Sequence, residues 1–85
     1  MVSVEIALKI LDEIEKALNL GFNKMYVNVD DLENGYGFLR VLAMRGAGDL
    51  IVFEGNFALH TCYEVLELLK RSKYEIRDFT MEVKL

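Results

Sequence analysis

Apolar residues recur every three or four positions through the first 20 residues of the chain. This spacing gathers them on one side of a helix, and charged residues cover the other side. The pattern predicts a helix from about Ser3 to Leu20, with Ser3 as its N-cap and Gly21 in the left-handed conformation that ends it. The predicted core stripe of this helix consists of Ala7, Ile10, Leu11, Ile14, Ala17 and Leu18.

The period then changes to two, which is the period of a half-buried β-strand. Strands are predicted over Lys24–Asp30 and about Tyr36–Arg45, and Asn34-Gly35 between them is a strong signal for chain reversal. The residues expected to face the helices are Met25, Val27 and Val29 in the first strand and Leu39, Val41 and Ala43 in the second.

A glycine-rich turn over Arg45–Asp49 leads to a third strand, which is predicted over Leu50–Glu54. Gly55-Asn56 is expected to end this strand. Alternation leaves open which of its sides faces the helices. The two alternatives are Leu50 with Val52 and Ile51 with Phe53.

A second helix is predicted over about Phe57–Ser72. Thr61 and Glu64 match a capping box, which offers an alternative start near Cys62. A last strand is predicted over about Tyr74–Lys84. The buried face expected for the helix is Ala58, Leu59, Cys62, Val65, Leu66 and Leu69, and the inward residues of the strand are Phe79, Met81 and Val83.

The predicted order α-β-β-β-α-β indicates an α+β two-layer sandwich, with two helices and a four-stranded, mostly antiparallel sheet. The last strand is expected beside the first. A length of 85 residues and a mass of 9.8 kDa suit one domain over residues 1–85. A hydrophobic content of 53 % excludes a disordered chain, and six Gly without any Pro exclude a collagen-like one.

The sequence predicts a soluble, cytoplasmic protein. No stretch approaches the roughly 18 apolar residues that cross a bilayer, and the first five residues lack the basic and apolar regions of a signal peptide. Cys62 is the single cysteine, so no disulfide forms within these 85 residues. Helices rich in Glu and Lys would suit a thermophilic source, whereas five Asn and four Met argue against one.

Ten Lys/Arg against 14 Asp/Glu give a net charge of −4, which argues against nucleic-acid binding driven by net charge. The predicted topology gathers opposite charges at opposite ends of the sheet. The acidic end holds Asp30, Asp31, Glu33, Glu54 and Glu82, and the basic end holds Lys24, Arg45, Lys70, Arg71, Lys73 and Arg77. Acidic neighbours dilute the basic end, and basic residues at a helix C-terminus stabilise its dipole. Nucleic acid is therefore not an expected partner.

The segment Asp30–Gly35 predicts a binding site for a divalent cation. Calcium takes six to eight oxygen ligands, and carboxylates with loop carbonyls supply them. The proposed ligands are Asp30, Asp31, Glu33, Asn34 and Glu54, and the expected ion is weakly bound Ca²⁺. The segment is not an EF-hand, because Val41 stands where that loop needs a bidentate Glu. The alternative is a solvated hairpin turn, in which Asp and Asn are common for backbone reasons.

Enzymatic activity is not expected, because the chain carries no catalytic signature. His60 and Cys62 are two positions apart, so they do not face each other on a helix. The sequence predicts an exposed His60 and a buried Cys62 without a third partner.

One side of the predicted sheet carries more apolar residues than an open face should. If Leu39, Val41 and Ala43 face the helices, then Phe38, Leu42 and Met44 fall on the other side, beside Arg40. A patch of this kind usually marks a partner surface, unless helices cover both faces. The alternative function is therefore a protein-interaction module, or a homodimer, that uses Phe38, Leu42 and Met44.

Overall fold

We analysed a computed structural model of the chain, which describes residues 2–74 and 76–78. The elements are α1 (Val2–Asn19), β1 (Lys24–Asp31), β2 (Tyr36–Arg45), β3 (Gly48–Ala58), α2 (Leu59–Lys70) and β4 (Ile76–Asp78). This confirms the predicted α-β-β-β-α arrangement of two helices and a three-stranded antiparallel sheet. Of the strand predicted over Tyr74–Lys84, the structure contains the three residues of β4. Residues 79–85, with Phe79, Met81, Glu82 and Val83, lie outside the described residues.

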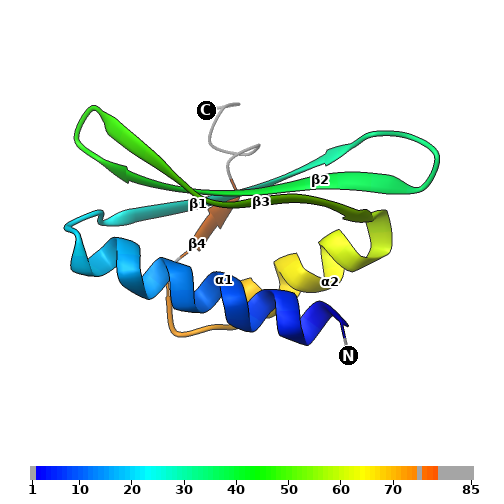
Figure 1. The fold of residues 1–85 in the computed structure, drawn as a ribbon, viewed down its shortest axis with the longest axis horizontal. Helices are drawn as coiled ribbons and strands as arrows, with labels where there is room; N and C mark the ends of the chain where they lie inside the picture. The colour runs from blue at the N-terminus through cyan, green and yellow to red at the C-terminus, as the bar shows by residue number, and fades with distance from the viewer. Residues whose placement is uncertain (1, 75, 79–85) are drawn as a thin grey trace.

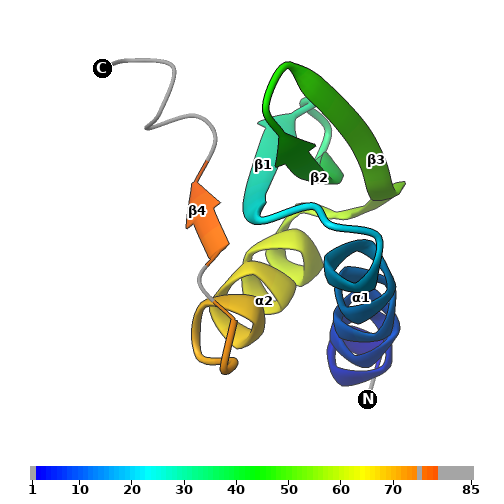
Figure 2. The same ribbon diagram turned by 90° about the vertical axis from the view of Figure 1, so that its left-hand side faces the viewer.

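The strands are arranged in the order β3-β2-β1-β4, with β2 antiparallel to both of its neighbours. The short strand β4 runs parallel to β1, with Ile76 opposite Met25 and Asp78 opposite Val27. Both helices lie against one face of the sheet, and no described helix lies on the other (Figures 1 and 2). We call the helix-free side the open face.

The core lies between the helices and the sheet, and strand alternation determines which residues enter it. Leu39, Val41 and Ala43 of β2 are fully buried there, as predicted. Met25 and Val27 lie opposite them on β1 and are also buried. The helices contribute Ala7, Ile10, Ile14 and Ala17 from α1 and Cys62, Val65, Leu66 and Leu69 from α2.

The third strand is longer than predicted, and Gly55-Asn56 does not end it. β3 pairs with β2 along its whole length, and the partner of Gly55 is Leu39. A register shift between Val41 and Leu42 leaves Val52 as an extra residue. Such a bulge reverses the alternation of a strand. As a result, neither predicted pair holds: the successive residues Val52 and Phe53 both pack against the core, and Ile51 falls on the open face. Leu50 lies opposite Ala43 but is 37 % exposed.

The helix ends correct two further predictions. Ser3 is not an N-cap, because it lies inside α1, is buried, and donates its hydroxyl proton to Glu64 Oε1 at 2.5 Å. The capping box is also wrong, since α2 begins at Leu59, whose N–H donates to Gly35 O at 2.7 Å. The predicted end of α1 is confirmed by Gly21, which has φ of +95°.

Candidate functional site

The acidic turn between β1 and β2 is a compact hairpin connection. Leu32 N–H donates to Tyr36 O at 3.0 Å, and Tyr36 N–H donates to Glu33 O at 3.1 Å. Glu33, Asn34 and Gly35 all have positive φ, between 55° and 80°. Asn and Gly tolerate this conformation, so the backbone of the turn is enough to explain why the sequence has Asn-Gly here.

The carboxylates of this turn are engaged in separate local contacts. Asp31 Oδ1 accepts the Glu33 N–H at 2.9 Å, as in an Asx turn, and Asp30 Oδ1 accepts from Asn28 Nδ2 at 3.1 Å. Adjacent residues of a strand point to opposite faces, so the Asp30 and Asp31 side chains diverge. The two hydrogen bonds therefore stabilise the hairpin.

Glu54 does not join the acidic turn. It lies on β3, which β2 separates from β1, and its Oε2 is 3.3 Å from Arg40 Nε. Among the described residues, no group of three His, Cys, Asp or Glu side chains is close enough to hold a metal ion. Calcium binding at Asp30, Asp31, Glu33, Asn34 and Glu54 stays a prediction, which this geometry does not favour.

The open face carries apolar side chains in the middle of the sheet. Phe38, Leu42 and Met44 lie on this side of β2 and are half-buried. Ile51 of β3 lies opposite Leu42, and 53 % of it is exposed. On β1, Tyr26 also lies opposite Leu42. It is 8 % exposed but does not belong to the main core cluster. These five residues define the apolar patch of the open face.

One ion pair lies on the same face. Arg40 of β2 pairs with Glu54 of β3, and its guanidinium lies over the Phe38 ring at 5.0 Å from the centroid. Both charged side chains are about 40 % exposed. A pair this exposed adds little stability, because water screens it. It does place one positive and one negative group beside the apolar patch.

The structure places Cys62 and His60 in different environments. Cys62 is fully buried, and its Sγ–H donates to Phe57 O at 3.9 Å. Burial raises the pKa of the Cys62 thiol above its usual range, so the thiol stays protonated and unreactive at neutral pH. His60 is exposed on the outer side of α2.

Two residues of the predicted basic end make contacts within the molecule. Arg45 Nη1 donates to Leu20 O at 2.8 Å, and its guanidinium lies 5.1 Å from the Phe22 ring centroid. Lys73 Nζ lies 5.3 Å from the Tyr74 ring centroid. The Arg45 contacts connect the end of β2 to the segment that follows α1, whereas the Lys73 contact is with the next residue of the chain.

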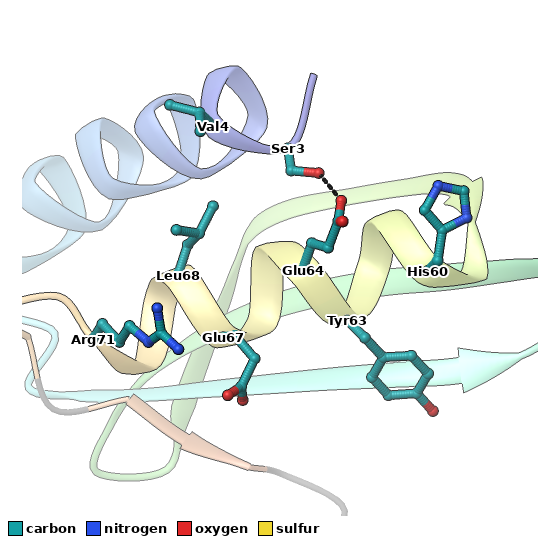
Figure 3. Close-up of a pocket in the computed structure, with 8 residues that line it drawn as sticks. All are labelled: Ser3, Val4, His60, Tyr63, Glu64, Glu67, Leu68 and Arg71. Atoms are coloured by element: carbon teal, nitrogen blue, oxygen red, sulfur yellow. Dashed lines mark hydrogen bonds between the residues drawn. The ribbon is translucent and has the colours of Figure 1, made fainter. Parts of the chain in front are cut away.

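A groove between α1 and α2 was not predicted from the sequence. It is a shallow, open groove with a volume of about 720 Å³ (Figure 3). Its described lining residues are Ser3, Val4, His60, Tyr63, Glu64, Glu67, Leu68 and Arg71. The signal that was overlooked is Val4, an exposed apolar residue of α1 that lines the groove.

The chain matches no known protein family, and no characterised protein or solved structure matches it either. Among the described residues, neither helix is long and apolar enough to cross a membrane.

Proposed function

We propose that this protein is an interaction module that forms a homodimer through the open face of its sheet. The observation that carries the proposal is the apolar patch around Leu42 and Ile51. A sheet that packs helices on one side normally presents polar residues on the other. Large apolar side chains in that position are stabilised when a partner removes them from water.

The dimensions of the open face suit a second copy of the chain. The two layers stack along the intermediate axis of a molecule measuring 36 × 29 × 19 Å, so the face lies within an outline of 36 by 19 Å. Covering this whole outline on both copies corresponds to roughly 1,400 Å², and a standard specific interface buries about 1,200–2,000 Å².

The ion pair beside the apolar patch is self-complementary. A two-fold interface brings the same surface together twice, so each group meets a group of the other copy. Arg40 and Glu54 provide one charge of each sign, and a two-fold axis near them lets the Arg40 of each copy pair with the Glu54 of the other. A symmetric partner therefore leaves neither Arg40 nor Glu54 without an opposite charge.

The proposal includes a fourth strand of full length in the sheet. We expect β4 to be the start of the strand predicted over Tyr74–Lys84, which gives a four-stranded sheet. The parallel pairing of β4 with β1 supports this, because it begins that strand at the predicted position beside β1.

The test compares two substitutions of exposed apolar residues on opposite faces. Ile51→Lys introduces a charge on the open face, and Leu8→Lys introduces the same charge on the exposed side of α1, where 61 % of Leu8 is exposed. Light scattering coupled to size exclusion measures the mass of each variant over an about hundredfold range of concentration.

We expect the wild type and Leu8→Lys to approach twice the chain mass of 9.8 kDa at high concentration. Ile51→Lys should weaken dimerisation about tenfold or more, because a buried unpaired charge is costly. A wild type that remains monomeric throughout overturns the proposal. Equal dimerisation of both variants shows that the interface lies elsewhere.

A further inference from the structure

The outer side of α1 carries a second apolar stripe, most of which lies outside the core. Val4, Leu8, Leu11 and Leu18 are spaced by four, three and seven residues, so they follow one side of the helix. Val4 and Leu8 are 40 % and 61 % exposed, and Leu11 is partly buried against the core. The stripe therefore borders the core at Leu11 and is exposed to solvent at Val4 and Leu8.

The groove meets this stripe at Val4, which lines it together with residues of α2. Leu68 and Glu64 point from α2 toward α1, whereas Tyr63 and Glu67 point away from it (Figure 3). Val4 and Leu68 give the groove apolar surface on both of its helices. From Val4 to Leu18, α1 rises by about 21 Å, which equals the length of a helix of about 14 residues.

Acidic side chains border this apolar surface. Glu64 is held in the groove by its hydrogen bond from Ser3, so one carboxylate is fixed at the wall. Glu67 lies on the outer rim of α2, and Glu15 of α1 is exposed at a position within the stripe. Arg71, at the end of α2, is the one Lys or Arg among the described lining residues.

We infer that this groove binds an amphipathic helix of a partner protein, with apolar residues along one side and Lys or Arg beside them. Apolar side chains at i, i+3, i+4 and i+7 of such a helix insert between the two helices, as in other helix-in-groove complexes. The cations lie against Glu64, Glu67 and Glu15. The site is separate from the open face, so it does not depend on dimerisation.

The test uses three synthetic helical peptides of about 18 residues. The first has a leucine stripe flanked by Lys, the second has the same stripe flanked by Glu, and the third has the composition of the first in scrambled order. Fluorescence anisotropy gives their affinities at physiological salt. Amide shifts of the protein in an NMR titration locate the bound peptide.

We expect the Lys-flanked peptide to bind at least about tenfold more tightly than either of the others, with shifts at Val4, Leu8, Glu64 and Leu68. E64Q/E67Q should weaken its binding about threefold or more. The matched control E33Q/D49N changes the net charge equally, in the β1–β2 turn and at the start of β3, and it should leave the affinity nearly unchanged.

Three results overturn the inference. The first is equal affinity for the Lys- and Glu-flanked peptides. The second is equal weakening by both double variants, which would mean attraction by net charge alone. The third is a set of shifts on the open face rather than on the helices, which would identify the sheet as the peptide-binding surface.

Discussion

Gly37 is required where β2 passes close to α2, although the sequence suggested only a strand residue. A Cβ atom at this position would lie 2.9 Å from Leu59 Cδ1 and 3.0 Å from Cys62 Sγ. We predict that Gly37→Ala lowers the free energy of unfolding by about 1–3 kcal/mol through overpacking. At Gly48, the nearest atom to a Cβ is Arg45 O at 3.5 Å. In urea unfolding, Gly48→Ala should therefore be much milder, and equal losses at both sites would contradict this account.

Cys62 should make the stability depend on pH in the alkaline range. Burial raises the thiol pKa in the folded state, so the folded protein keeps this proton to higher pH than the unfolded chain does. The stabilisation is complete below the unfolded pKa, near 9.0, and it is lost as the pH rises above that value. We predict a shallower loss of unfolding free energy above pH 9 for Cys62→Ala. Identical slopes for the variant and the wild type would show that the thiol is not involved.

The acidic turn illustrates what residue types alone leave undecided. Five oxygen-bearing side chains predicted a cation site, but the folded chain directs Asp31 to a backbone N–H and Glu54 to Arg40. We predict small, non-saturating amide shifts when Ca²⁺ is titrated at constant ionic strength. Saturable shifts confined to Asp30–Gly35 and abolished by D30N/D31N would instead establish the calcium site.

At the scale of elements, periodicity predicted α1, β1 and β2 almost to their observed ends. The alternation in β2 was strict enough to identify its buried side, because Leu39, Val41 and Ala43 are all fully buried. β3 was less predictable, since its extent depends on pairing with β2 rather than on its own residues. The bulge at Val52 arises from that pairing, and no pattern in the neighbouring residues predicts it.

The end of α1 depends on a contact from a distant element. Arg45, the last residue of β2, donates to the Leu20 carbonyl and stacks on Phe22. We predict that Arg45→Ala lowers the free energy of unfolding by about 1 kcal/mol and speeds hydrogen exchange at the end of α1. Arg45→Lys keeps the charge but lacks the planar guanidinium, so it should recover only part of the loss. Unchanged exchange in Arg45→Ala would contradict this role.

At the scale of the whole molecule, the α-β-β-β-α arrangement followed from the order of periods, and the open face followed from the surplus of apolar residues in β2. The groove between the helices was not predicted, because it depends on how α1 and α2 lie against each other. Ser3 shows the same limit: its bond to Glu64 joins residues 61 positions apart. The alternation within β2 therefore predicts its part of the open face, whereas no local pattern predicts a surface that forms between two helices.

The most direct test of the proposed dimer is an isotope-filtered NMR experiment on a mixture of labelled and unlabelled protein. It detects contacts between copies and ignores contacts within one copy. The account predicts contacts between copies that involve Phe38, Leu42, Met44 and Ile51, the members of the apolar patch that reach solvent. Their absence at millimolar concentration, or contacts confined to α1 and α2, would contradict it.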